Sequence, residues 1–208
     1  MNTKLIKFNK DYTSKEIREC ADILLQNKVL IHPTENLYGF GSIISNQKGI
    51  DNIIKLKKRQ KPHRFIILIS NYSQLSRLAF VKSNLEYALM QKFWPGSLTI
   101  IFKANPNLNN KYSYNSTVAV RMVGNEITRK IIDYIDIPII STSLNKSGEI
   151  PINSVYEIVR RFSGKVGGIA IDNIHHFQNI ASTVVQIKKD KIYVLRRGAI
   201  DENELYKI

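Results

Sequence analysis

The stretch TVAVRMVGNEITRKIIDYIDIPIIS, from Thr117 to Ser141, decides the fold class of this chain. Its opening, Thr117 to Met122, alternates and is rich in β-branched residues, which predicts a strand. The apolar run Ile137 to Ser141 predicts a second strand. Between the two, apolar residues recur at helical spacing, at Ile127, Ile131, Ile132 and Ile135. A strand, a helix and a strand in so short a stretch favour an α/β layer arrangement.

The flanking chain repeats this interleaving. Further strands are predicted at Val29 to His32, Phe65 to Ile69, Leu98 to Phe102, Ser182 to Ile187 and Ile192 to Leu195. Helical patterns cover Thr13 to Asn27, which opens with a capping box of Thr13 and Glu16, then Ile50 to Ile54, Leu85 to Phe93 and Val155 to Phe162. The link Lys188 to Lys191 is too short for a crossover helix, so its two strands should be antiparallel. We expect a twisted, mixed sheet flanked by helices.

Length and composition indicate a folded, globular chain. With 208 residues, 43% hydrophobic and 23% charged, it can bury a full core and differs from disordered proteins. No repeat or composition shift marks a boundary, so one domain is expected over residues 1–208. No segment approaches the roughly 20 apolar residues of a membrane span, and no signal core follows Met1, so a cytosolic location without membrane contact is expected. The lone Cys20 is expected to be buried.

The charge balance points to anionic partners. Thirty-one Lys and Arg against seventeen Asp and Glu leave a net charge of +14, which would attract nucleotides, phosphorylated substrates or nucleic acid. A biased base composition of the genome explains scattered lysines equally well, so only clustered charge counts as evidence. One such cluster is KLKKRQKPHR, Lys55 to Arg64, where like charges must repel one another unless a polyanion compensates. The alternative is a solvated helix end whose cations match the helix dipole.

Another candidate segment is HPTENLYGFGS, His32 to Ser42, directly after a predicted strand. Pro33, Gly39 and Gly41 predict a turn, from which backbone NH groups could face a ligand together with the side chains of Thr34, Glu35 and Tyr38. The segment lacks the Gly-Lys-Ser/Thr ending of a Walker loop and the third glycine of a dinucleotide fingerprint. An ordinary strand-to-helix loop is the alternative.

Two further segments could hold ligand groups. Arg121 lies on the opposite strand face from Val118, Val120 and Met122, where it either points to solvent or captures a carboxylate in a cleft. The run STSLNKSG, Ser141 to Gly148, follows an apolar strand, and its hydroxyls with Asn145 form either a phosphate and sugar cradle or a polar turn. Hairpin geometry should also bring Ser182 and Thr183 close to Arg196 and Gly198.

The sequence offers little for metal or nucleophilic catalysis. The four histidines, expected in loops, have no ligand spacing: His32, His63, His175 and His176. No Ser occupies a Gly-x-Ser-x-Gly elbow, and no acid/base pair stands out. We therefore expect no protein-bound metal, and catalysis by positioning and charge neutralisation.

Seven motifs in register resemble the YrdC family of threonylcarbamoyl-AMP synthases. In chain order they are PTENLYGFG, KKR, FWPGSLTIIF, TVAVRM, STSLNKSG, STVV and LRRGAI, and the match spans about Lys28 to Ile200. The chain is similar to the short, single-domain form of that family. The resemblance implies a YrdC-like fold with a large basic cavity. It also implies a nucleotidyltransferase that makes threonylcarbamoyl-AMP and pyrophosphate from L-threonine, bicarbonate or CO2, and ATP with Mg²⁺.

The resemblance carries site roles onto matching positions. Lys57 and Arg59 would be the catalytic pair that holds the ATP phosphates. The rest of the implied nucleotide site is His63, Thr117, Ser143, Asn145 and Arg196. Arg121 would clamp the threonine carboxylate, and the other implied threonine-binding residues are Thr34, Asn36, Ser141 and Ser182. The product would pass to the tRNA threonylcarbamoyl transferase machinery.

The chain departs from the family pattern at several positions. Asn36 replaces a usual second Thr, His63 with Arg64 replaces an Asn-Pro pair, and Gln60 replaces a common Pro. Asn36 can still hydrogen-bond a hydroxyl or carboxylate, but selectivity for threonine is left open. Two other readings stay in view. One is a double-stranded RNA or tRNA-binding module of the same fold without this activity, and the other is a family paralogue with an altered substrate.

Overall fold

The computed structural model describes residues 2–58, 65–108, 112–145 and 149–208. Its strands are β1 Lys4–Phe8, β2 Leu30–His32, β3 Gly39–Ile43, β4 Ile66–Ile69, β5 Ala79–Phe80, β6 Leu98–Ala104, β7 Thr117–Met122, β8 Ile139–Ser143, β9 Gly168–Asp172, β10 Thr183–Lys188 and β11 Lys191–Arg196. Its helices are α1 Ser14–Leu25, α2 Gln47–Lys57, α3 Tyr72–Leu78, α4 Asn84–Phe93, α5 Glu126–Ile135, α6 Val155–Phe162 and α7 Glu202–Leu205.

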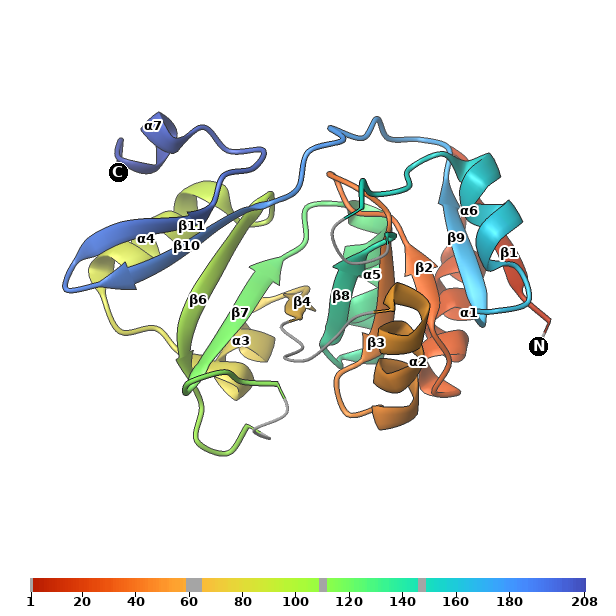
Figure 1. Ribbon diagram of the computed structural model, residues 1–208, viewed down its shortest axis with the longest axis horizontal. Helices are drawn as coiled ribbons and strands as arrows, with labels where there is room; N and C mark the ends of the chain where they lie inside the picture. The colour runs from red at the N-terminus through yellow and green to blue at the C-terminus, as the bar shows by residue number, and fades with distance from the viewer. Residues whose placement is uncertain (1, 59–64, 109–111, 146–148) are drawn as a thin grey trace.

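All strands join one mixed sheet, as expected. The order is β1-β9-β2-β3-β8-β4-β7-β6-β10-β11, with β5 paired to β6. The sheet contains both parallel pairs, such as β4 with β7, and antiparallel pairs, such as β3 with β8. The final hairpin is antiparallel, with Val185 opposite Val194, which confirms the prediction from its short link. The connection from β9 to β10 runs along the top of Figure 1 and joins the two halves of the sheet.

The helices cover the sheet in layers (Figure 1). In the half that contains β1, β2, β3, β8 and β9, one apolar cluster joins the sheet to α1 and α5, and another joins its other face to α2 and α6. A third cluster packs α3 and α4 against β6 and β7. As predicted, Val118, Val120 and Met122 of β7 point into this third cluster, and Cys20 of α1 is fully buried. The helix α1 begins with the expected capping box of Thr13 and Glu16.

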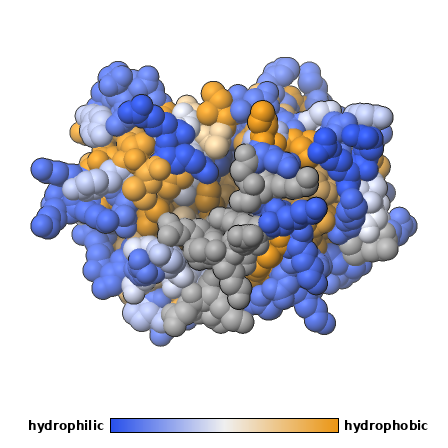
Figure 2. All heavy atoms as spheres, in the orientation of Figure 1, coloured by the Kyte–Doolittle hydropathy of each residue, from blue (hydrophilic) through white to orange (hydrophobic). Residues whose placement is uncertain are grey.

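Side chains of a strand alternate between its two faces, so residues two apart lie on the same face, and this alternation positions the side chains of the site. In β8, Ile139 packs beneath α1 and α5, and Ser141 and Ser143 follow it on the same strand face. In β2, Leu30 joins the same apolar cluster, and His32 follows it. Ser141 and Ser143 of β8 carry hydroxyl groups to a cavity, whereas His32 at the end of β2 is fully buried. Figure 2 shows apolar atoms gathered in the middle of the visible face, between hydrophilic rims.

One segment differs from its prediction. Gly39 and Gly41 do not form a turn, because both lie in β3, which pairs antiparallel with β2 and β8. The chain reverses earlier, at residues 33–38, where the Thr34 NH donates to the Leu37 carbonyl. With two glycines and Ile43 as its one β-branched residue, β3 has little of the usual strand pattern, so the sequence indicated a loop. The elements β1, β5, β9, α3 and α7 were also not predicted.

Candidate active site

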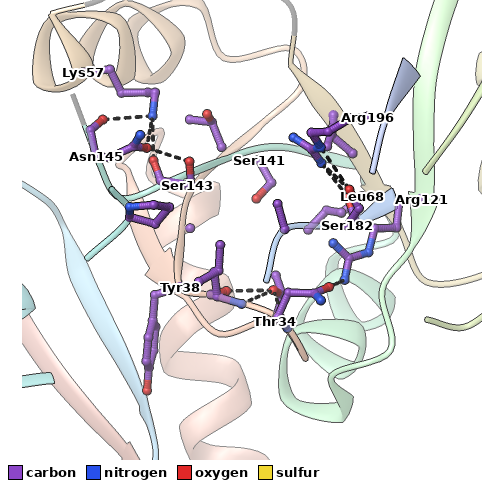
Figure 3. A pocket seen from close by; sticks show the side chains of 17 residues that line it. Thr34, Tyr38, Lys57, Leu68, Arg121, Ser141, Ser143, Asn145, Ser182 and Arg196 are labelled. Carbon is purple, nitrogen blue, oxygen red and sulfur yellow. Dashed lines mark hydrogen bonds between the residues drawn. The ribbon is translucent and has the colours of Figure 1, made fainter. Parts of the chain in front are cut away.

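A cavity of about 300 Å³ lies where the two halves of the sheet meet (Figure 3). Ligand pockets in proteins usually begin at about this size. Its polar lining comes from separate parts of the chain and includes Thr34, Asn36, Lys57, Arg121, Ser141, Ser143, Asn145, Ser182 and Arg196. Ile66 and Leu68 of β4 supply apolar wall. The cavity therefore gathers nine of the twelve residues that the resemblance implies.

Lys57 holds the loop that follows β8. Its ammonium, at the end of α2, donates to the Ser143 carbonyl at 2.7 Å, the Asn145 carbonyl at 2.9 Å and Asn145 Oδ1 at 2.8 Å. The Ser143 hydroxyl also donates to Asn145 Oδ1, at 2.6 Å. The buried Lys57 ammonium is therefore hydrogen-bonded to Ser143 and Asn145, two residues that are expected to bind nucleotide (Figure 3). An anion that binds the Lys57 ammonium must compete with these loop oxygens for its N–H groups.

Arg121 is fixed at the opposite side of the cavity. Its Nε donates to the Gly96 carbonyl at 2.9 Å, and its Nη2 donates to Asn36 Oδ1 and forms an ion pair with Glu35. Among the described residues, Nη1 has no hydrogen-bond partner, so it is the guanidinium nitrogen left for a ligand in the cavity that Arg121 lines. Of the two orientations considered for Arg121, the structure shows the cleft-lining one, with 5% of the residue exposed.

Asn36 is already bonded on both ends of its side chain. Its Oδ1 also accepts from the Ser97 hydroxyl at 3.0 Å, and its Nδ2 donates to Gln178 Oε1 at 3.0 Å. Gln178 belongs to the connection between β9 and β10, whose Asn179 NH donates to the Asn36 carbonyl. Asn36 thus joins Arg121 to that connection, and one of its amide N–H groups remains for a ligand.

The turn at Thr34 is held by its own side chain. The Thr34 hydroxyl donates to the Leu37 carbonyl at 2.7 Å and accepts from the NH groups of Asn36 and Leu37. Of the other two side chains expected to face a ligand, Glu35 does not line the cavity, and Tyr38 lines it but has its hydroxyl bonded to the protein. The Glu35 carboxylate accepts from the NH groups of Gly124 and Asn125, at the start of α5. Tyr38 is buried and its hydroxyl accepts from the Asp172 NH at 2.9 Å.

The hairpin of β10 and β11 brings Ser182 to Arg196, as predicted. The Arg196 guanidinium donates to the Ser182 carbonyl at 2.8 and 2.9 Å and to Ser182 Oγ at 2.8 Å. The hydroxyls of Ser182 and Thr99 lie 2.9 Å apart. Burial, and then the neighbouring charge of Arg121, lower the pKa of the Arg196 guanidinium. Two arginines thus face one cavity, which favours an anion between them.

Of the predicted site residues that the structure describes, Thr117 does not line this cavity. Thr117 begins β7, two strand positions before Ala119 and four before Arg121, and it lines a separate hollow beside Lys82, Lys103 and Gln186. Its hydroxyl donates to the Tyr114 carbonyl. The expectation that Thr117 completes the nucleotide site therefore has no support in its position. Arg59 and His63 lie outside the described residues.

A family model described as telomere recombination, Sua5_yciO_yrdC, matches residues 22–198. The chain belongs to the Sua5/YciO/YrdC family. Within it, the chain is 29% identical over 91% of its length to a threonylcarbamoyl-AMP synthase of Bacillus subtilis, and 30% identical over 93% to one of Pyrococcus abyssi. These matches cover 55% and 57% of the two relatives. The chain thus spans little more than half the length of these relatives.

Solved structures of the Sua5/YciO/YrdC family share this fold. Sua5 of P. abyssi complexed with L-threonine has a TM-score of 0.90 and 28% identity, covering 98% of this chain and 60% of that one. YciO of E. coli has a TM-score of 0.84 and 23% identity, covering 97% and 98% of the two chains. These likenesses confirm the predicted mixed α/β fold with helices on its sheet.

The donor set of the cavity suits anions better than a resident metal. Its described lining has three cationic side chains, Lys57, Arg121 and Arg196, and no carboxylate. Elsewhere in the described ranges, no cluster of three His, Cys, Asp or Glu could hold a metal ion. In the same ranges, no helix combines the length and apolar character needed to cross a membrane.

Sequence reasoning missed several groups of the site. The Gly96 carbonyl, Ser97 and Gln178 orient Arg121 or Asn36. Gly96 and Ser97 lie in the motif FWPGSLTIIF, to which no site role was assigned, and Gln178 lies in a connection with no distinctive pattern. His32 ends β2, in agreement with the strand predicted at Val29 to His32, and it is fully buried, contrary to the expectation of a loop histidine. Its Nε2 lies 3.1 Å from the hydroxyl of Ser141. A buried histidine beside a cavity carries no signal in a single sequence, because the enclosing groups come from distant strands.

Proposed function

We propose that this chain is an L-threonylcarbamoyladenylate synthase that uses L-threonine, bicarbonate or CO2, and ATP. The observation that carries this proposal is the convergence of Lys57, Ser143 and Asn145 with Arg121 and Arg196 on one cavity. The names of its relatives support the same activity. The product, threonylcarbamoyl-AMP, would supply tRNA threonylcarbamoyladenosine formation by a separate transferase machinery. The cytosolic location expected from the sequence belongs to this proposal.

The chemistry requires two bonds to form. The amine of bound threonine adds to CO2 and loses a proton, which gives a carbamate. A carbamate oxygen then attacks the α-phosphorus of ATP, and the bond to the β-phosphate oxygen breaks to release pyrophosphate. Negative charge grows on the leaving pyrophosphate, so fixed cations lower the barrier without any covalent enzyme intermediate.

The cavity divides between the two substrates. The region of Lys57, Ser143 and Asn145 offers cationic and hydroxyl groups for phosphate, and Arg59 is proposed to join it. At the other side, Nη1 of Arg121 is suited to a carboxylate, and Ser141 of β8 and Ser182, which directly precedes β10, line the same cavity. The reacting carbamate would then form between the phosphate and carboxylate regions. This arrangement uses proximity and charge rather than general acid/base groups.

Mg²⁺ enters this proposal as part of the ATP substrate. The ion prefers oxygen ligands and is commonly held by one or two carboxylates with substrate phosphates. Because the described lining lacks carboxylates, the protein residues fit Mg²⁺ carried on the triphosphate rather than held in a protein cage. When bound there, the ion neutralises phosphate charge, and Lys57 and Arg196 add to that neutralisation.

Pyrophosphate release tests the proposal directly. The chain is incubated with Mg²⁺ and ATP, and pyrophosphate is measured with threonine and bicarbonate each added or withheld. Release that needs both co-substrates supports the synthase. Release with another amino acid in place of threonine identifies a paralogue, the outcome that Asn36 leaves open. The RNA-binding alternative predicts salt-dependent binding of double-stranded RNA or tRNA without ATP turnover.

A further inference from the structure

His32 occupies a slot built for it by two glycines. The imidazole is fully buried and lies against β3, where a Cβ on Gly41 would come within 2.7 Å of His32 Cδ2. A Cβ on Gly39 would lie 2.8 Å from Ser141 Oγ and 3.3 Å from His32 Nε2. Neither glycine has a positive φ, so backbone conformation does not require them. The absence of two side chains lets the ring of β2 reach across β3 to β8.

The contacts of the ring fix its tautomer. His32 Nδ1 lies 3.2 Å from the Pro33 carbonyl oxygen, which can only accept, so Nδ1 carries the hydrogen. The Thr128 hydroxyl donates to the same carbonyl, at 2.5 Å, and leaves its own oxygen as a second acceptor 3.3 Å from Nδ1. Burial lowers the pKa of His32 to about 4, which keeps the ring neutral near pH 7. Nε2 therefore has a free lone pair.

That lone pair determines how Ser141 meets the cavity. Nε2 lies 3.1 Å from Ser141 Oγ and accepts its hydrogen. Ser141 lines the cavity, and with its hydrogen committed to His32 the oxygen offers only lone pairs to a ligand. A hydroxyl that donates to a strong acceptor also becomes a better acceptor itself. The site thus presents an acceptor, held in one orientation by His32 from β2, on the far side of β3.

We propose that His32 is a positioning residue of the amino-acid subsite, which holds the Ser141 hydroxyl as the hydrogen-bond acceptor for the α-amine of the substrate. The inference rests on the proposed function for the identity of the substrate. Of the groups on an amino acid, the carboxylate only accepts, so it cannot use Ser141 and is suited to Arg121. The α-ammonium only donates. Orienting the amine in this way would set the direction from which it meets CO2.

A double-mutant cycle tests whether His32 acts through Ser141. The variants are His32→Phe, which keeps a ring in the slot, Ser141→Ala and the double variant, with His175→Phe as a control. His175 bonds Asp172 outside the cavity. Each single variant should weaken threonine binding about tenfold, the effect of one hydrogen bond to a charged group, and leave ATP binding unchanged. The double variant should match Ser141→Ala. Losses that multiply, or that fall equally on ATP, would overturn the proposal.

A binding comparison identifies the group that Ser141 contacts. Calorimetry compares L-threonine with 2-aminobutyrate, which keeps the amine and lacks the β-hydroxyl, on wild-type protein and Ser141→Ala. The same loss for both amino acids supports contact with the amine. A loss confined to threonine would assign Ser141 to the β-hydroxyl and overturn the amine contact.

Nitrogen NMR on the unaltered chain covers the case in which His32→Phe does not fold. Long-range ¹H–¹⁵N spectra distinguish a protonated from an unprotonated ring nitrogen, and substitution of the other three histidines assigns His32. We expect hydrogen on Nδ1 and none on Nε2. A hydrogen on Nε2 would refute the inference. These spectra need no turnover, so a chain that releases no pyrophosphate would count against the proposed function and not against the assignment of His32.

Discussion

The polar groups around the cavity are held by the protein before any ligand arrives. The Lys57 ammonium donates to three acceptors of the loop after β8, and Arg196 is bonded to Ser182. Such preorganisation reduces the cost of ordering these side chains when a ligand binds. It also means that a substitution removes both a ligand contact and a support of the site. The predictions for single residues follow from this double role.

Lys57→Ala should slow pyrophosphate release by about tenfold to a thousandfold, the range for losing one preorganised charge partner. The variant removes the cation that bonds Ser143 and Asn145 and frees the loop it holds. Steady-state pyrophosphate release measures the effect. Lys58→Ala, at the next and exposed position, is the matched control and should stay near the wild-type rate. Equal activity in both variants would remove Lys57 from the phosphate region.

Arg121→Ala should raise the threonine concentration needed for half-maximal rate far more than the ATP concentration. The guanidinium is bound to Gly96 and Asn36 and leaves Nη1 for a carboxylate, so its loss should cost about tenfold or more in threonine binding. Rates measured against each substrate in turn separate the two effects. An equal rise for both substrates would contradict the carboxylate assignment.

At the scale of elements, the hairpin of β2 and β3 links packing to the site. Gly39 and Gly41 face His32, so a strand with two positions that lack side chains lies beside a fully buried imidazole. In a strand, glycine normally weakens packing, and here the space it leaves is filled by a neighbouring ring. The two glycines of β3 give up side-chain packing of their own. The space they leave allows His32 of β2 to contact Ser141 of β8.

Gly41→Ala should destabilise the fold by about 1–3 kcal/mol, the usual cost of overpacking a filled site. The added Cβ would meet His32 Cδ2 at 2.7 Å, and the extended backbone adds no penalty of its own. Urea unfolding measures the free energy. In a His32→Ala background the ring is gone, so the same substitution should cost less. A cost that does not change in that background would show that the imidazole is not what Gly41 accommodates.

At the scale of the whole molecule, stability should fall as the pH drops from about 6.5 to about 4. Burial lowers the pKa of His32 from 6.5 to about 4, so in this window the unfolded chain binds a proton that the folded chain does not. Stability is then lost as pH falls, by about 3 kcal/mol at most. Urea unfolding of wild type and His32→Phe across this range isolates the contribution. A parallel pH dependence in the two proteins would exclude it.

Several features could be predicted because their causes are local. The capping box of Thr13 and Glu16, the alternation of β7 and the short hairpin link each depend on residues close together in sequence. The motifs at Lys57, Arg121 and Ser143 could be found because they stand in the chain in the same order as the motifs of the family that the sequence resembles. Thr117 belonged to the same pattern, yet a strand advances about 3.3 Å per residue, which places it well away from Arg121.

The sequence by itself determined the alternation of strands and helices, the buried face of β7 and the membership of a family whose motifs it carries in order. Only the tertiary structure decided that Gly39 and Gly41 lie in a strand, that Asn36 bonds Arg121 and Gln178, and that His32 meets Ser141. The physical reason is the range of the interactions. Periodicity and capping act within a few residues, whereas these contacts join strands and connections that only the folded sheet brings together.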